Sequence, residues 1–257
     1  MRDIKISIVQ TSLFWENIDD NLTMLSDMLS AIKIKTDLIV LPEMFTTGFT
    51  MNAKSCAESP EGKAVYFLKR WSQKKKSHIC GSVVIKENNN YYNRLFVVSP
   101  DGIINHYDKR HLFRMAKEHH TYTPGRKKLI LKIKGWRIAF FICYDLRFPV
   151  WCRNRNDYDA AVFVANWPER RSYHWKNLLL ARAIENQSYV IGVNRVGLDG
   201  NKINYSGDSA VINPLGEYLS DLKNKHGIFS VSLNYKDLEN YRKKFPVHKD
   251  ADKFKIL

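Results

Sequence analysis

The chain is poor in cysteine and shows no cysteine pattern of a known kind. Its 257 residues include four cysteines, Cys56, Cys80, Cys143 and Cys152, with no CxxC pair or other metal-site spacing among them. A chain of this length can bury a sizeable core without disulfides, and no apolar presequence indicates export to an oxidising compartment. We therefore expect four reduced thiols, which argues against a disulfide scaffold or a cysteine-ligated zinc module.

The chain also lacks long apolar runs, linkers and repeats. Its longest apolar runs, such as "IAFFIC", are far shorter than the roughly 20 residues that a membrane-spanning helix needs. No low-complexity segment or short repeat divides the sequence. These absences predict a soluble, cytoplasmic protein with no membrane partner, folded as one domain over residues 1–257.

Acidic residues are scarce relative to basic ones, with 26 Asp and Glu against 41 Lys and Arg and a formal net charge of +15. Basic clusters occur in "KRWSQKKKSH", "RKKLILKIKGWR" and "YRKKFPVHK". Each lies at the end of an expected helix or on the outer face of an expected strand, where solvated side chains are the ordinary interpretation. Because no helix-turn-helix, zinc-finger or RNA-recognition signature accompanies them, we expect no nucleic-acid partner. Attraction of small anionic substrates accounts for the charge more simply.

The hydrophobic period switches repeatedly between 2 and about 3.6, which indicates alternating strands and helices and an α/β fold. Strands are expected at 4–10, in "TDLIVLPEMF" up to Pro42, and at 78–85, 91–99, 103–108, 129–133, 137–143, 160–167, 189–196, 208–213 and 227–233. Helices are expected at 18–34 with Asn17 as cap, from Ser59 and Pro60 to 76, and at 149–154, 172–187 and 235–243. So many strands suggest two sheets flanked by helices.

Three expected strands end on a reactive side chain. Glu43 follows "LIVLP", Lys109 follows "INHYD", and Cys143 follows "IAFFI". Functional sites gather beyond the carboxyl ends of strands, because the loops there carry chemical groups on a rigid frame. The coincidence therefore predicts one site built from these three residues.

Each of the three residues also has a structural interpretation. Cys143 could be an inert buried thiol, Glu43 a helix cap or surface charge, and Lys109 a solvated cation. Their combination favours chemistry, because a thiol becomes a strong nucleophile only as a thiolate. Glu43 could act as the base, and Lys109 could supply positive charge.

Longer motifs around these residues resemble one family. "LPEMF", "YDKRHLF" and "CYDLRFP", in this order, resemble the Glu–Lys–Cys signature of the nitrilase, or carbon–nitrogen hydrolase, superfamily. The similarity continues through "ANWP", "LLLARAIENQSYVIGVNRVG" and "YSGDSAVINPLGE", so it covers nearly the whole chain. Among the branches it is most similar to the bacterial omega-amidases.

The resemblance implies a four-layer α-β-β-α sandwich that dimerises through its helical faces. It implies that Cys143 is the nucleophile, that Glu43 is the general base and then the acid, and that Lys109 stabilises the oxyanion. Glu118 matches the family's second glutamate, which orients Lys109; a surface charge or a partner for Arg114 are its alternatives. The backbone N–H of Tyr144 is a second candidate donor to the oxyanion.

Three further residues are candidates for substrate binding. Arg147 could pair with Asp145 or another acid, or bind the distal carboxylate of a substrate. Phe45 and Trp167 could form an apolar wall, although core packing is an alternative for both. His119, His120 and His174 have no metal-site spacing, so we expect no metal and no cofactor.

The expected function is therefore that of an omega-amidase. It would hydrolyse the terminal amide of a small dicarboxylate monoamide, such as 2-oxoglutaramate, through a cysteine thioester. Another carbon–nitrogen hydrolase, acting on a carbamoyl amino acid or an aliphatic amide, and a basic nucleic-acid-binding protein on this scaffold are the alternatives.

Overall fold

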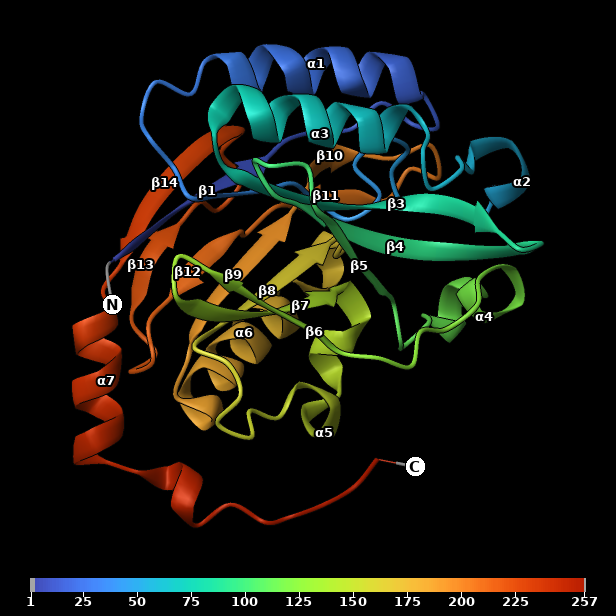
Figure 1. Ribbon diagram of the computed structural model, residues 1–257. Coiled ribbons are helices and arrows are strands. Elements are labelled where there is room, and N and C mark those ends of the chain that lie inside the picture. Colours follow the sequence, from blue (N-terminus) through green and yellow to red (C-terminus); the bar gives the residue numbers. More distant parts are fainter. Residues whose placement is uncertain (1–2, 257) are drawn as a thin grey trace.

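Two six-stranded sheets lie face to face between layers of helices in the computed structural model, which describes residues 3–256 (Figure 1). Helices α1 (Ile18–Ser30) and α3 (Lys63–Lys75) cover the outer side of the first sheet. Helices α5 (Pro149–Cys152) and α6 (Ser172–Asn186) lie on the outer side of the second. The expectation of a four-layer α-β-β-α sandwich is confirmed.

The first sheet has the strand order β14-β1-β2-β3-β4-β5. Its centre is parallel, because β2 pairs in parallel with both β1 and β3, while the other neighbouring pairs are antiparallel. The strands are β1 (Ile4–Gln10), β2 (Leu38–Val40), β3 (His78–Glu87), β4 (Asn90–Val98), β5 (Ile104–Asp108) and β14 (Gly227–Leu233).

The second sheet has the order β13-β12-β9-β8-β7-β6. Strand β8 pairs in parallel with β7 and β9, so this sheet also has a parallel centre. The strands are β6 (Leu129–Ile133), β7 (Trp136–Ile142), β8 (Ala160–Ala165), β9 (Tyr189–Asn194), β12 (Ala210–Ile212) and β13 (Tyr218–Asp221). A separate hairpin of β10 (Val196–Leu198) and β11 (Asn204–Ser206) stands beside them, and α7 (Tyr235–Lys244) follows β14.

The main core fills the space between the two sheets. The rings of Phe141 and Phe163 stack with centroids 5.0 Å apart, and Tyr107 of the first sheet meets Phe141 edge to face at 6.2 Å. A second core joins the first sheet to α1 and α3 through residues such as Leu29 and Trp71. Because both faces of the central strands are buried, these strands read as continuous apolar runs in the sequence.

The expected strands are confirmed, but two helix boundaries differ. Helix α1 ends at Ser30, not at 34, because the chain must turn to enter β2 beside β1. Just before β2, Asp37 N donates to Lys5 O of β1 at 2.8 Å. Helix α3 begins at Lys63, so the start at Ser59 and Pro60 is wrong. Those two residues form a turn instead.

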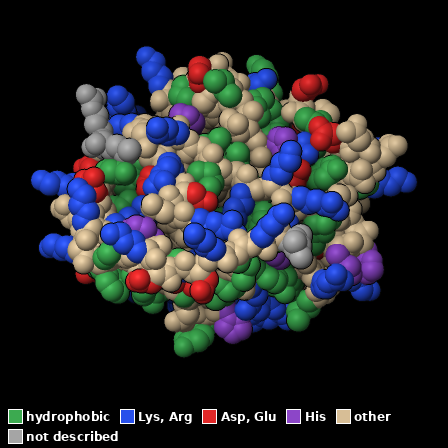
Figure 2. Space-filling view, turned by 60° about the horizontal axis from the view of Figure 1, so that its bottom comes forward, with side chains coloured by type: hydrophobic (Ala, Val, Ile, Leu, Met, Phe, Trp, Pro, Cys, Tyr) green, Lys and Arg blue, Asp and Glu red, His purple; other side chains and the backbone are tan. Residues whose placement is uncertain are grey.

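Besides the 3-10 helices, the sequence did not predict five short elements: α2 (Ala53–Cys56), α4 (Glu118–Thr121), β10, β11 and β13. The helices have one turn each and the strands three or four residues, too short for either hydrophobic period to register. Within residues 3–256 no helix combines the length and apolar character that crossing a membrane requires. Figure 2 shows Lys and Arg side chains spread over the face in view, with fewer Asp and Glu among them.

Candidate active site

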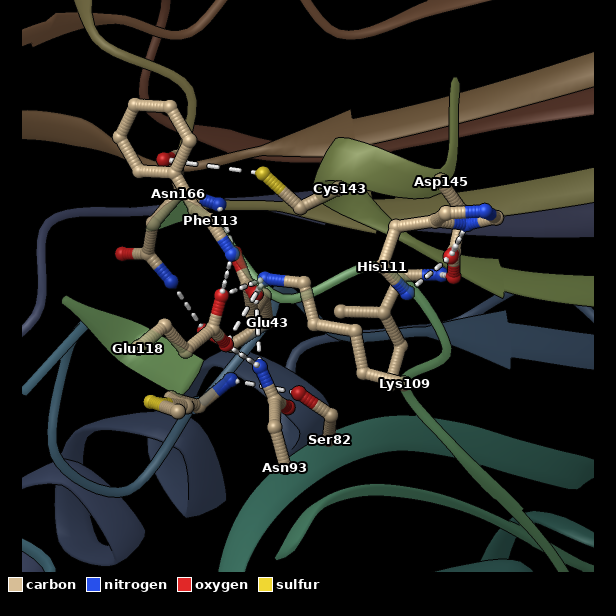
Figure 3. Close-up of polar contacts among 12 residues, drawn as sticks. Glu43, Ser82, Asn93, Lys109, His111, Phe113, Glu118, Cys143, Asp145 and Asn166 are labelled. Atoms are coloured by element: carbon tan, nitrogen blue, oxygen red, sulfur yellow. Dashed lines mark hydrogen bonds and ion pairs between the residues drawn. The ribbon is translucent and has the colours of Figure 1, made fainter. Parts of the chain in front are cut away.

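The ends of three strands bring reactive side chains together between the two sheets (Figure 3). Glu43 lies just beyond β2, and Lys109 directly follows β5, both in the first sheet. Cys143 directly follows β7 of the second sheet, which faces the first. Glu118 is the first residue of α4, in the loop after Lys109. Residues separated by as many as 100 positions in the sequence (43 to 143) thus meet at one place.

Lys109 lies between two carboxylates. Its Nζ donates to Glu43 Oε1 at 2.8 Å and to Glu118 Oε1 and Oε2 at 3.0 and 3.1 Å. All three side chains are buried, with at most 1% of their area exposed. Buried charges persist only when they are paired and hydrogen-bonded, so this ion triad is a built arrangement rather than a solvated cluster.

Asn93, in the middle of β4, bridges the two carboxylates. Its Nδ2 donates to Glu43 Oε1 at 2.8 Å and to Glu118 Oε1 at 3.4 Å. The backbone N–H of Asn166 donates to Glu43 Oε2 at 2.7 Å. Oε1 of Glu43 therefore accepts two hydrogen bonds while Oε2 accepts one, which leaves Oε2 a free acceptor position for a proton.

Cys143 stands on a strained turn. Its φ is 44°, in the left-handed region that a residue with a Cβ rarely adopts. Met44, beside Glu43, and Lys117, beside Glu118, also have positive φ, at 43° and 57°. Strained backbone of this kind clusters at functional sites, where the surrounding structure holds it. The Cys143 thiol lies 3.9 Å from the carbonyl oxygen of Asn166 and keeps 8% of its residue area exposed.

Burial and charge set the protonation of these groups. Burial raises the pKa of the Cys143 thiol well above its ordinary value, and the Glu43 carboxylate raises it further. Burial by itself would lower the pKa of Lys109, but the charges of Glu118 and Glu43 outweigh it and raise that pKa. Burial also raises the pKa of Glu118, against the opposing effect of Lys109. At neutral pH the site therefore holds a neutral thiol beside a charged ammonium.

Asp145 anchors the turn that carries Cys143. This turn is a 3-10 helix over Cys143–Arg147, and Asp145, its third residue, is fully buried. Asp145 Oδ2 accepts from Tyr107 at 2.7 Å and from Ile142 N at 3.0 Å, and Oδ1 accepts from His111 N at 3.0 Å. The turn is thus fixed to both sheets, because Tyr107 belongs to β5 and Ile142 to β7.

A cavity of about 530 Å³ opens onto Cys143 and Lys109. Glu43 and Glu118 lie behind these two residues and do not line it. Much of the wall is aromatic, from Trp15, Phe49, Phe113, Tyr144, Trp167 and Tyr205. A small organic molecule that enters the cavity therefore meets the thiol and the ammonium together.

The predicted substrate-binding residues have different outcomes. Trp167 and Arg147 line the cavity. Phe45 does not: it is fully buried against Phe67 in the core between the first sheet and α3, so its assignment to the cavity wall is wrong. The wall has Phe49 instead, because the chain turns back into the core directly after Glu43.

Arg147 has no ion pair with Asp145 or another acid among the residues that the structure describes. Its Nη2 lies 2.9 Å from His174 Nδ1 instead. Tyr144, the other oxyanion candidate, is in the first turn of the 3-10 helix, where backbone N–H groups have no acceptor within the helix. His119 and His120 lie together on α4, and no group of three or more potential metal ligands occurs within residues 3–256.

Sequence reasoning missed Asn93 and gave no role to Asn166. The signal for Asn93 was the only amide in the expected strand over 91–99, directly before "RLFVV", because a buried polar side chain needs partners. For Asn166 it was the end of "AAVFVA", the strand next to the one that delivers Cys143. Neither signal identifies the partner, because both bonds to Glu43 cross between segments distant in the sequence.

Comparison with known proteins agrees with this geometry. The model of the carbon–nitrogen hydrolase family matches residues 5–243. The chain is 46% identical to a protein of Escherichia coli K12 named "Omega-amidase YafV", over 100% of both chains. It is 32% identical to a Bacillus subtilis protein named "2-oxoglutaramate amidase", over 96% of this chain and 97% of that protein.

A solved structure agrees as well. A CN-hydrolase superfamily protein of Xanthomonas campestris, whose structure has an arsenic adduct in the active site, superposes with a TM-score of 0.98. It is 42% identical to this chain, and the match covers 100% of both. Sequence, fold and site geometry lead to one conclusion: the chain belongs to the carbon–nitrogen hydrolase family.

Proposed function

We propose that the chain is an omega-amidase, which hydrolyses the terminal amide of a small dicarboxylate monoamide such as 2-oxoglutaramate to the dicarboxylate and ammonia. The observation that carries the proposal is the buried Glu43–Lys109–Glu118 triad behind a thiol that opens onto a cavity. The names of the relatives from Escherichia coli and Bacillus subtilis support the choice of substrate.

Acylation begins with a neutral thiol. Since the pKa of Cys143 is raised, its proton must leave as the sulfur attacks the amide carbon, and Glu43 is the base beside it. Oε2 is the oxygen of Glu43 with a free acceptor position, so it takes the proton. The C–S bond forms while the carbonyl π electrons move onto oxygen.

The developing oxyanion needs donors that already point toward it. Lys109 Nζ and the backbone N–H of Tyr144 fill this role in the proposal, and one such donor typically contributes about 3 kcal/mol to lowering the barrier. Glu118 keeps Lys109 charged and in place through two hydrogen bonds. Glu43 then gives its proton to the departing nitrogen, the C–N bond breaks, and ammonia leaves an acyl thioester on Cys143.

Hydrolysis of the thioester uses the same groups. Glu43, ionised again, takes a proton from water as the water oxygen attacks the acyl carbon. The C–S bond breaks, the proton returns to the sulfur, and the free carboxylic acid leaves. The cycle consumes one water and releases one ammonia, with Cys143 restored.

We further propose that the protein works in the cytoplasm as a homodimer paired through its helical faces. Exposed apolar side chains on the second helical layer support this pairing. Val150 of α5 and Tyr173 and Ile184 of α6 are 57%, 75% and 47% exposed. Such residues are ordinary members of an interface between copies.

A panel of small amides, scored for ammonia release by the purified protein, tests the function. It should include 2-oxoglutaramate, an N-carbamoyl amino acid and an aliphatic amide. We expect turnover of 2-oxoglutaramate, and none from Cys143→Ala at an unchanged melting temperature. Cys80→Ala is the matched control, because Cys80 is a buried thiol in β3 away from the cavity. Preference for the carbamoyl compound, or full activity of Cys143→Ala, would refute the proposal.

A further inference from the structure

The cavity wall carries three arginines whose charge is not balanced locally. Arg147, Arg170 and Arg171 line it, and none has a carboxylate within ion-pair distance among the residues of 3–256. Arg94 and Arg242, by contrast, pair with Asp108 and Asp159, whereas the fully buried Arg195 has no ion pair among the described residues. Three positive charges therefore line the cavity without an acidic partner.

The two acidic residues of the cavity, Glu16 and Asp199, form no ion pair with these arginines. Glu16 accepts hydrogen bonds from Thr50 and Asn52. Asp199 accepts from the hydroxyl of Tyr205 at 3.0 Å and from the backbone N–H groups of residues 201 and 203. Both carboxylates hold loops of the wall rather than the arginines.

Two of the three arginines lie over aromatic rings. The Arg147 guanidinium lies over Trp167, 4.8 Å from the ring centroid, and that of Arg171 lies over Phe113 at 5.2 Å. The Trp167 indole donates to the carbonyl oxygen of Arg171 at 2.8 Å, so the support of one arginine is tied to the backbone of the other. Contact with a ring supports a guanidinium while its N–H groups can still bind an anion. Arg147 Nη2 is already in contact with His174 Nδ1 at 2.9 Å, and Arg171 Nη1 lies 4.0 Å from Met115 Sδ, so an anion would bind the other N–H groups.

The arginines also oppose one another's charge. Burial lowers the pKa of Arg171, and the charges of Arg170 and Arg147 lower it further. An anion placed among them would remove this repulsion. Arg147 and Arg171 line the same cavity as the Cys143 thiol.

We propose that Arg147 and Arg171 form a clamp for the carboxylate at the far end of the substrate, while the amide meets Cys143. This inference rests on the proposed function and adds the residues that choose the substrate. The clamp requires an omega-amide whose other end is a carboxylate, and it disfavours amides with a neutral or cationic end. Paired N–H groups of arginine match the two oxygens of a carboxylate in geometry and charge.

Two amides of equal length test the clamp. Glutaramate has a carboxylate where pentanamide has a methyl group. The wild type should have a kcat/KM for glutaramate at least about 10-fold above that for pentanamide. Arg171→Gln and Arg147→Gln should each lower kcat/KM for glutaramate about 10- to 100-fold, mostly through KM, and change that for pentanamide less than about threefold.

The remaining variants separate charge from geometry. Arg171→Lys keeps the charge but loses the paired donors, so it should recover only part of the selectivity. Arg126 is exposed and lies outside the cavity, so Arg126→Gln is the matched control and should leave kcat/KM unchanged for both substrates. If the wild type prefers glutaramate but both glutamine variants keep that preference, the clamp is wrong while the proposed function stands. If the wild type hydrolyses neither amide nor 2-oxoglutaramate, the proposed function itself fails.

Discussion

Asn93 is the residue that keeps the two carboxylates of the ion triad in fixed positions. One ammonium cannot neutralise two carboxylates, so Glu43 and Glu118 repel each other across Lys109. The amide of Asn93 donates to Oε1 of both and offsets part of this repulsion without adding charge. A neutral donor is therefore what the position requires, because a cation would weaken the base and an acid would add a third negative charge.

Asn93→Leu should lower kcat about 10- to 100-fold, because both carboxylates lose a donor in a buried site. Asn93→Asp should move the acid limb of the pH profile of kcat/KM upward, because a third carboxylate raises the pKa of Glu118 further. Asn90→Asp, at the exposed start of the same strand, is the control for charge. Unshifted profiles and unchanged kcat in both Asn93 variants would show that the triad does not depend on this amide.

The pH profile of the wild type follows from the directions of the shifts. Acid should protonate Glu118 at a pH above the ordinary glutamate range of about 4.3, because its pKa is raised, and activity falls as Lys109 loses that partner. Raised pKa values also keep the Cys143 thiol and the Lys109 ammonium protonated far into the alkaline range. We therefore expect kcat/KM to stay flat from about pH 7 to 9. A rise across that range, as a titrating thiol would give, contradicts this assignment.

The sequence could predict the reactive residues but not the bonds among them. Glu43, Lys109 and Cys143 stood out because each ends an apolar strand, and their side-chain chemistry is complementary. Asn93 and the backbone N–H of Asn166 were not predictable, because the bonds they form depend on register between segments 50 and 123 residues apart. The position of Phe45 was predicted wrongly for a local reason. In the turn after Glu43, a shift of one residue decides whether a side chain points into the core or into the cavity.

Among the elements, the short 3-10 helix over Cys143–Arg147 matters most, because it determines where the sulfur points. Leu146 packs it into the main core, and Asp145 fixes it to Tyr107, His111 and Ile142. This explains why an apolar strand ends in "CYDLR". The strand provides rigidity, and the acid two residues after the cysteine turns the chain back on itself.

Asp145→Ala should therefore affect stability and catalysis together. It leaves three donors unpaired, two of them buried, so we expect the free energy of unfolding to fall by about 3 kcal/mol or more, and kcat to fall as the turn loosens. Equilibrium unfolding in urea and steady-state kinetics measure the two effects. Asp252→Ala, exposed near the C-terminus, should change neither. Normal stability and kcat in Asp145→Ala would contradict the role of Asp145 in holding this turn in place.

Long elements were predictable, because burial on one or both faces gives them a clear period or a continuous apolar run. This holds for β1, β7, β8 and α6, and fails for α2, α4 and the β10–β11 hairpin, which are too short to show a period. The start of α3 was missed for a local reason. The Glu58 side chain accepts from Ala64 N at 3.0 Å, a role that the sequence had suggested for Ser59.

For the whole molecule, the net charge of +15 should act on substrate capture. A positive field raises the local concentration of an anionic substrate, and salt screens it over a Debye length of about 10 Å at 0.1 M. We expect kcat/KM for glutaramate to fall severalfold between about 20 and 300 mM potassium chloride, while that for pentanamide stays constant. Equal salt dependence for both amides would mean that the basic surface has no part in capture.

At this scale the sequence predicted the architecture through family resemblance. The alternation of hydrophobic periods indicates two sheets flanked by helices only in outline. The four-layer order came from the motifs that resemble the nitrilase superfamily. The single domain over residues 1–257 and the homodimer stay predictions. Packing of the two sheets face to face places Lys109, which follows a strand of one sheet, opposite Cys143, which follows a strand of the other. The site therefore exists only when the whole sandwich is folded.

The central claim is that the acyl group is transferred to the sulfur of Cys143 before water attacks. The most direct test adds hydroxylamine, which competes with water for the acyl group and gives a hydroxamate in place of glutarate. Glutaramate and the monomethyl ester of glutarate are compared as substrates, because both would form the same thioester. One thioester formed from both substrates predicts the same ratio of hydroxamate to glutarate, with no product from Cys143→Ala and an unchanged ratio from Cys80→Ala. Ratios that differ between amide and ester, or hydroxamate made by Cys143→Ala, would contradict the account.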